Sequence, residues 1–87
     1  MTPINFRYIT RAIILSNDYL LLCKQKQGNY TFLPGGHIEL GESATQALER
    51  EIQEEIGEFV SIKNFSGAIE NAWENECELS LFFEVNH

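Results

Sequence analysis

Three glutamates stand close together in the middle of the chain, at positions 51, 54 and 55. On a helix that advances about 100° per residue, Glu51, Glu54 and Glu55 fall within roughly a third of the circumference. Carboxylates crowded on one helix face repel one another at neutral pH, so they raise the free energy of the folded chain unless a cation neutralises them. Hard divalent cations prefer oxygen ligands of this kind. We therefore interpret this face as a preformed site for a hard divalent metal ion.

A helix between residues 43 and 57 must position these carboxylates. Ser43 is a favourable N-cap, and Gln46 completes a capping box three residues later. Gly57 is a favourable C-terminal stop, because glycine adopts the left-handed conformation that ends many helices. Apolar residues recur at three- and four-residue spacing beside the acidic face: Ala44, Ala47, Leu48, Ile52 and Ile56. The pattern predicts a helix that packs on a sheet and keeps its carboxylates exposed.

Five strands are predicted around this helix. They cover residues 6–15, 19–25 and 30–33 before it, and residues 59–69 and 76–85 after it, with a possible bend at 66–67. We expect a hairpin turn at 16–18, a loop at 27–29, a stop at Pro34 and the two glycines after it, and a loop at 71–75 that carries Trp73. The fold class is therefore α/β (α+β), a mixed sheet with one long helix on one face.

The segment Ala12–Leu15 is apolar on both faces and so predicts a central strand. Such a sheet needs cover on both faces, but the 87 residues supply only one convincing helix. We therefore expect residues 1–87 to form one domain that is incomplete at its C-terminus and lacks a second covering helix. A second copy of the chain could supply the cover, so we also expect a homo-oligomer, most simply a dimer.

Composition limits the partners. The formal net charge is −7, with 13 acidic and 6 basic residues, which argues against the backbone of a nucleic-acid polymer as ligand. A small phosphorylated ligand stays compatible, because a bound metal ion would invert the local field. No apolar run approaches the roughly 20 residues that span a bilayer, and no secretory signal is seen, so we expect a cytoplasmic protein. Cys23 and Cys77 have no metal-type spacing and are expected to be buried free thiols.

Residues 36–57 resemble the Nudix box, G-x5-E-x7-R-E-U-x-E-E-x-G-U, in which U is an aliphatic residue. Every charged and glycine position of that pattern is met, by Gly36, Glu42, Arg50, Glu51, Glu54, Glu55 and Gly57. Ile52 fills the first aliphatic position, whereas Glu58 stands at the last one, a departure followed directly by Phe59 and Val60. The chain is thus similar to MutT-like Nudix hydrolases, as a C-terminally short or truncated member.

The resemblance implies hydrolysis of a nucleoside diphosphate linked to another moiety, such as a nucleotide or a nucleotide-sugar, by attack of water on phosphorus. It implies Mg²⁺ or Mn²⁺ as cofactor, because these ions cancel phosphate charge and lower the pKa of bound water. Two alternatives stay open. The chain could be a non-catalytic module that binds nucleotide or metal, or an inactive fragment, and a purely structural acidic helix is a third reading. The box residues act on the diphosphate that all candidate substrates share, so the sequence does not identify the substrate.

The resemblance also implies residue roles. Glu51, Glu54 and Glu55 correspond to the metal-binding carboxylates, with a carbonyl of Gly36 or its neighbour Gly35 as a further ligand. One glutamate of this set would act as general base, which makes Glu51 and Glu54 catalytic candidates.

Supporting and substrate roles complete the set of expected site residues. Arg50 joins the catalytic set as the residue that pairs with a glutamate and holds the acidic face in shape. Glu42 and Gly35 are supporting residues. Substrate-binding candidates are Arg11, Lys24 and His37, each of which could instead be an ordinary surface residue.

Overall fold

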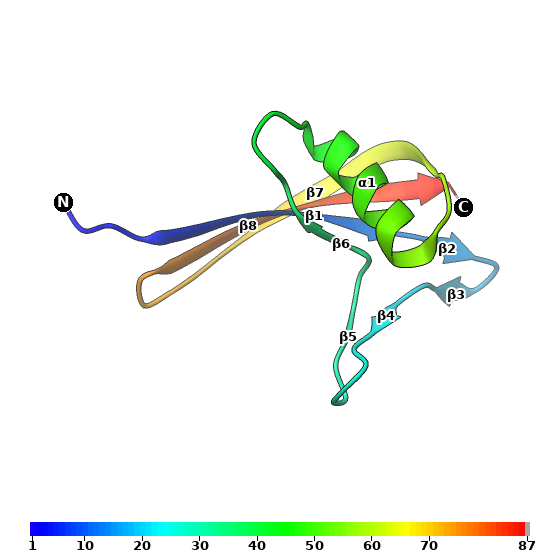
Figure 1. Ribbon diagram of the computed structural model, residues 1–87, viewed down its shortest axis with the longest axis horizontal. Helices are drawn as coiled ribbons and strands as arrows, with labels where there is room; N and C mark the ends of the chain where they lie inside the picture. Colours follow the sequence, from blue (N-terminus) through cyan, green and yellow to red (C-terminus); the bar gives the residue numbers. More distant parts are fainter. Residues whose placement is uncertain (87) are drawn as a thin grey trace.

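A four-stranded mixed sheet organises the chain in the computed structural model, which describes residues 1–86 (Figure 1). Its strand order is β6-β1-β8-β7. The central pair β1 and β8 is parallel, whereas β6 and β7 are antiparallel to their neighbours. The strands of this sheet are β1 (Asn5–Ile13), β6 (Gly35–His37), β7 (Ser61–Trp73) and β8 (Glu76–Asn86). The expected mixed α+β sheet is therefore confirmed.

The helix α1 (Ala44–Ile56) forms where local signals predict it. The backbone N–H of Gln46 donates to the Ser43 hydroxyl, and the Gln46 side chain accepts from the Ser43 N–H, so the capping box is complete. Gly57 ends the helix in the left-handed conformation, with φ of 81°. The predicted apolar stripe supplies the core: Leu48 and Ile52 are fully buried and pack with Ala12, Ile14, Phe83 and Val85.

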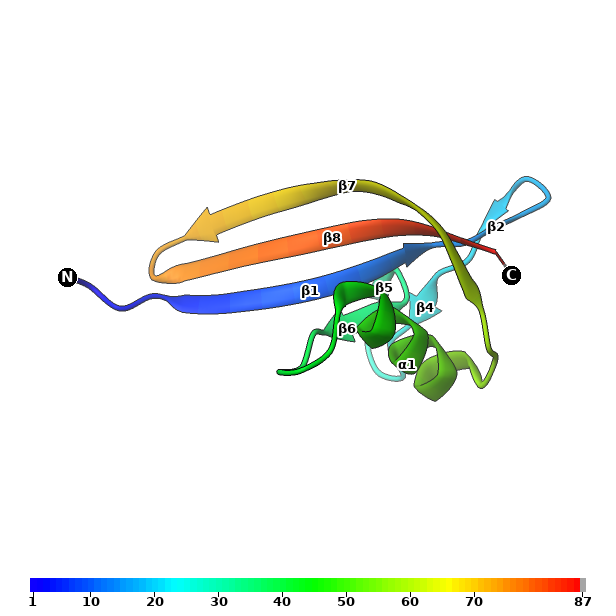
Figure 2. The ribbon, with the colours of Figure 1, turned by 90° about the horizontal axis from the view of Figure 1, so that it is seen from above.

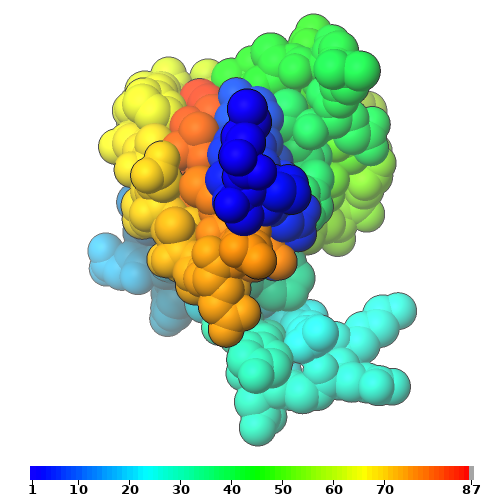
Figure 3. Space-filling view, turned by 90° about the vertical axis from the view of Figure 1, so that its left-hand side faces the viewer, coloured from blue at the N-terminus to red at the C-terminus, as the bar shows by residue number. Residues whose placement is uncertain are grey.

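The prediction of one strand over residues 19–25 was wrong. The segment is divided between β3 (Tyr19–Leu20), which pairs with β2 (Leu15–Ser16), and β4 (Cys23–Lys24), which pairs with β5 (Thr31–Phe32). Neither pair joins the main sheet, and Leu20, Leu21 and Leu22 stay 36–45% exposed. The apolar run lacks a regular ladder because its residues change partners midway. Figure 3 shows the β4–β5 segment as a cyan and teal arm projecting from the body.

Two turn assignments also needed correction. Gly35 and Gly36, expected to stop a strand, instead begin strand β6, which pairs with β1 in the register Ile9↔His37 to Arg11↔Gly35. Trp73, expected in a loop, is the last residue of β7, and the chain turns only at Glu74, whose φ is 51°. The expected bend near residues 66–67 is present, because the β7–β8 register shifts between Phe65 and Gly67.

The helix covers only one face of the sheet. Figure 1 views the sheet from its edge, with α1 above it and the β3–β5 segment below, and Figure 2 shows α1 over the β6 segment and next to β1. Within residues 1–86, α1 is the only helix, and it is too short to cross a membrane. Cys23 and Cys77 are free thiols, as predicted, although both are half-buried rather than buried. The chain thus presents one covered and one largely open sheet face.

Candidate active site

Two consecutive glycines bring the edge strand β6 close to the helix. A Cβ on Gly35, whose φ is 142°, would lie 2.0 Å from the Thr10 carbonyl oxygen, so only glycine fits there. A Cβ on Gly36 would lie 2.6 Å from the carboxyl carbon of Glu51. The absence of both side chains therefore lets β6 lie between β1 and α1, with the Glu51 carboxylate resting directly on the backbone of the strand.

Glu55 contacts the same strand from the last turn of α1. Its Oε1 accepts a hydrogen bond of 2.9 Å from the backbone N–H of Gly35. Glu51 and Glu55 thus both contact the glycine pair, because residues four apart lie on the same face of a helix. Gly35, Gly36, Glu51 and Glu55 form the centre of the candidate site.

Arg50 links this centre to the loop that precedes the helix. Its Nε and Nη2 contact the two carboxylate oxygens of Glu42 at 3.0 Å and 2.7 Å, a bidentate pair. Its Nη2 also donates to the His37 carbonyl at 3.1 Å. Its Nη1 contacts Glu51 at 2.9 Å and both oxygens of Glu54 at 3.5 Å. The pairing of Arg50 with glutamates that the resemblance implies is therefore present, and one guanidinium connects β6, the loop and α1.

The electrostatics of Glu42 and Arg50 follow from this pairing. The hydrogen bonds from Arg50, together with that from the Glu39 backbone N–H, lower the pKa of Glu42 to about 2. The pKa of Arg50 is raised, chiefly by its hydrogen bonds to Glu42. Both groups therefore stay charged across the physiological pH range, and Arg50 supplies positive charge to an otherwise acidic face.

The acidic side chains suit a hard cation in their chemistry but are not gathered into a ready-made cage. Among residues 1–86, no three acidic, histidine or cysteine side chains converge on one point. Arg50 already pairs with Glu51 and Glu54, and Glu55 accepts a hydrogen bond from the backbone N–H of Gly35 on β6. The donor set consists of carboxylate and carbonyl oxygens, as Mg²⁺ requires. The residues present therefore fit such an ion in kind, provided that Glu54 or Glu55 reorients.

The substrate-binding candidates are dispersed. His37 lies on β6, where its carbonyl binds Arg50 and its side chain is exposed. Lys24 lies on the projecting β4–β5 pair and is exposed. Arg11 lies beside Gly35 in the β1–β6 register, donates to the Leu33 carbonyl at 3.1 Å and stands 5.9 Å from the Phe32 ring centroid. Of the three side chains, only that of Arg11 contacts the segment directly before the glycine pair, at Phe32 and Leu33.

Sequence reasoning missed one residue at this site. Cys23 lies near Glu55 and Arg11, and its thiol pKa is raised by burial, by the negative charge of Glu55 and by a hydrogen bond to it. The apolar run around Cys23 predicts a core position instead. No sequence signal places it beside α1, because that position depends on where the β4–β5 arm crosses the sheet edge.

The comparisons with known proteins agree with this geometry. A family model described as "NUDIX domain" matches residues 6–85. The nucleoside triphosphatase NudI of Enterobacter sp. (strain 638) is 43% identical over 61 residues, which cover 64% of this chain and 43% of that protein. The RNA pyrophosphohydrolase of Campylobacter jejuni subsp. doylei is 42% identical over 59 residues, covering 61% of this chain and 38% of that protein. The chain thus spans about two fifths of the length of these relatives.

A solved structure is similar over almost the whole fold. It is a NUDIX hydrolase from Nitrosomonas europaea, with a TM-score of 0.82 and 26% identity, covering 98% of this chain and 59% of that one. The match extends over the sheet and α1, and the family model spans nearly the same residues. The chain therefore belongs to the Nudix family.

Proposed function

We propose that this chain is a pyrophosphohydrolase that cleaves a phosphoanhydride bond in a small nucleotide or nucleotide-sugar. One observation carries the proposal: α1 presents Glu51 and Glu55 against the Gly35–Gly36 backbone, with Glu54 on the same helix beside Arg50, at the spacing of the Nudix box. The relatives named above are a triphosphatase and a pyrophosphohydrolase, and the reactions these names denote both break a phosphoanhydride bond. We expect the same bond class here, in the cytoplasm, and without a nucleic-acid polymer as necessary partner.

Glu51, Glu54 and Glu55, with the carbonyl of Gly36, are the groups that would hold Mg²⁺ or Mn²⁺. When bound, such an ion offsets the negative charge of the phosphates and lowers the pKa of the attacking water. Arg50 keeps the Glu51 carboxylate in place by a 2.9 Å contact and ties α1 to Glu42. We assign it a positioning role, since its donors are already engaged within the protein.

Glu54 is our candidate for the general base. Its side chain is 59% exposed, and Arg50 holds it only at 3.5 Å. Glu51 is 18% exposed and held at 2.9 Å. A base must be free to take a proton from water and release it again, which favours the loosely held Glu54 over Glu51.

The test is phosphate release from nucleoside triphosphates, ADP-ribose and dinucleoside polyphosphates in the presence of Mg²⁺. We expect Glu54→Gln to lower kcat by roughly 10²- to 10⁴-fold, the usual contribution of a general base. Glu55→Gln should also lower activity, and it should raise the Mg²⁺ concentration needed for half-maximal activity, because it removes a proposed metal ligand. Glu49→Gln is the matched control, because Glu49 is exposed on the same helix and lies outside the box pattern. Full activity in both Glu54→Gln and Glu55→Gln would contradict the assigned roles.

A second function, nucleotide binding without turnover, is favoured by a specific observation. Arg50 occupies the Glu51 and Glu54 carboxylates, and the acidic groups are not gathered around one point. Calorimetry that detects nucleotide binding together with no hydrolysis over hours would support this function.

We also propose that the chain is a homo-oligomer, with the open face of the sheet as the supporting feature.

A further inference from the structure

Thr10, on β1, carries a buried hydroxyl that the proposed hydrolysis does not use. The residue is fully buried, and within residues 1–86 its Oγ1 has no hydrogen-bond partner. Burying a hydroxyl without a partner destabilises a fold, so each such group in a native protein calls for an explanation. We propose that Thr10 positions the Glu51 carboxylate by hydrogen bonding to it through one buried water. The inference rests on the metal-binding role proposed above for Glu51.

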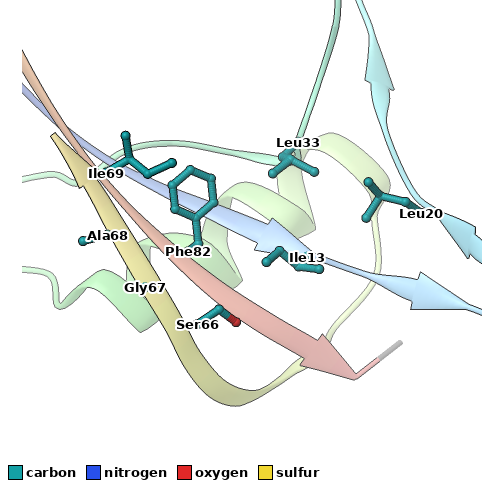
Figure 4. A pocket seen from close by; sticks show the side chains of 8 residues that line it. All are labelled: Ile13, Leu20, Leu33, Ser66, Gly67, Ala68, Ile69 and Phe82. Atoms are coloured by element: carbon teal, nitrogen blue, oxygen red, sulfur yellow. The ribbon is translucent and has the colours of Figure 1, made fainter. Parts of the chain in front are cut away.

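The Thr10 side chain lies on the face of β1 that α1 covers. Side chains alternate along a strand, and Ala12, two residues later, packs with Leu48 and Ile52 of the helix. Ile13, which points the other way, lines an apolar hollow on the opposite face of the sheet (Figure 4). The Thr10 hydroxyl is therefore in the layer between the sheet and α1, where the Glu51 carboxylate also lies.

The pairing of β1 with β6 places Thr10 beside the glycine on which Glu51 rests. Thr10 is directly opposite Gly36 in the antiparallel register. The Cβ positions of such a pair are roughly 4.5–5.5 Å apart. A Cβ on Gly36 would lie 2.6 Å from the carboxyl carbon of Glu51 and 2.7 and 2.8 Å from its two oxygens. Because Gly36 has no side chain, no side chain of that residue separates the hydroxyl from the carboxylate.

The Glu51 carboxylate has the capacity to accept this contact. Its side chain is only 18% exposed, and Arg50 Nη1 donates to its Oε1 at 2.9 Å. A carboxylate can accept about four hydrogen bonds, so one arginine nitrogen does not saturate it. A mostly buried carboxylate gains stability from each further donor. A donor without a partner and an acceptor with remaining capacity thus lie on either side of Gly36.

A single water molecule can connect the two groups. The hydroxyl makes no direct hydrogen bond to Glu51, since its Oγ1 is without a partner in the described part of the chain. Buried waters typically make two to four hydrogen bonds to polar groups that would otherwise be unpaired, and Thr10 and Glu51 supply two of them. Together with Arg50, this bridge would hold the carboxylate in one orientation, as the ligands of metal ions require.

A double-mutant cycle without metal tests the contact itself. The equilibrium constant of unfolding is measured in urea and EDTA for wild type, Thr10→Val, Glu51→Ala and the double variant. We expect the combined effect to differ from the product of the single effects by at least about threefold, because groups in one hydrogen-bond network are not independent. Thr31→Val is the matched control, since Thr31 is exposed on β5 and should combine with Glu51→Ala by simple multiplication. Simple multiplication for Thr10 as well would overturn the proposal.

Magnesium binding measured by calorimetry tests whether the contact serves the site. We expect Thr10→Val to raise the Mg²⁺ Kd by about 10- to 100-fold, and Thr10→Ser, which keeps the hydroxyl, to raise it by less than about threefold. A Thr10→Val variant that binds Mg²⁺ as tightly as wild type, or equal losses in the valine and serine variants, would contradict the positioning role.

Two further comparisons keep the outcome unambiguous. If Thr10→Val does not fold, Thr10→Ser and Thr10→Ala replace it in both measurements, because these two variants differ only in the hydroxyl. Hydrolysis is measured in parallel on every sample. An active chain in which Thr10 and Glu51 are not coupled overturns the positioning role alone, whereas coupling in an inactive chain supports the contact and counts against the hydrolase.

Discussion

On the α1 side of the sheet, Leu48 and Ile52 are fully buried, and a single arginine joins the helix, the loop and β6. On the other side, Ile69 is 59% exposed beside an apolar hollow that Ile13 and Phe82 also line. The Arg7–Glu76 ion pair joins only the neighbouring strands β1 and β8. The first side is held together by contacts within the chain. The second has apolar surface without internal cover. The difference indicates that the core and the candidate site lie on the α1 side, while residues 1–86 leave apolar surface uncovered on the other side.

The largest expected effect comes from removing core volume on the covered side. Ile52→Ala should lower the free energy of unfolding by about 2–5 kcal/mol, because it leaves a cavity between α1 and the sheet. Ile69→Ala should change it by only about 0.5 kcal/mol, because Ile69 is 59% exposed. Urea unfolding of the two variants measures the contrast. Equal losses would mean that the two faces do not differ as described.

A smaller effect is expected from Arg50. A lysine keeps the positive charge but presents one compact donor group instead of a planar fork, so it does not reproduce the contacts to Glu42, Glu51 and His37 together. We expect Arg50→Lys to lower kcat/KM by roughly 10- to 100-fold, as is usual when the partner of a ligand is altered. Arg7→Lys on the open face is the matched control and should leave hydrolysis intact. If both substitutions lowered activity equally, the positioning role of Arg50 would be contradicted.

The smallest effect is the pH dependence of the Glu42–Arg50 pair. The folded-state pKa of Glu42 is lowered from 4.5 to about 2, so the pair stabilises the fold at pH values above 4.5. This contribution is lost as the pH falls from 4.5 towards 2, because the unfolded chain takes up the proton first. Urea titrations across this window should show a steeper loss in wild type than in Glu42→Gln, which has no carboxylate there. Parallel curves would show that the pair does not contribute.

The sequence predicted the helix and its caps well because those signals are local. Ser43, Gln46 and Gly57 act on backbone groups within a few residues, so neighbouring positions contain the whole interaction. The approach of Glu51 to Gly36 was also within reach, since the resemblance to the Nudix box puts the glycines next to the acidic face.

The segments that were predicted poorly depend on distant partners. The residues around Leu20 are apolar enough for a central strand, but their register is decided by β2 and β5 rather than by the main sheet. Trp73 continues β7 because β8 offers it a partner in Glu76. The reach of Arg50 to Glu42 and His37 likewise depends on where the loop crosses β6. Patterns within one segment carry no information on such pairings.

The parallel pairing of β1 with β8 has a consequence for biosynthesis. Asn5 lies beside Glu76 and Ile13 beside Glu84, so the centre of the sheet joins the first and the last strand of residues 1–86. During translation, β1 leaves the ribosome long before β8 exists, and one of its hydrogen-bonding edges stays open through the whole interval. Unpaired strand edges invite contacts with other chains, and contacts between distant residues form slowly. We expect the nascent chain to acquire its sheet only after synthesis of β8, and to rely until then on chaperones or on low expression to avoid aggregation.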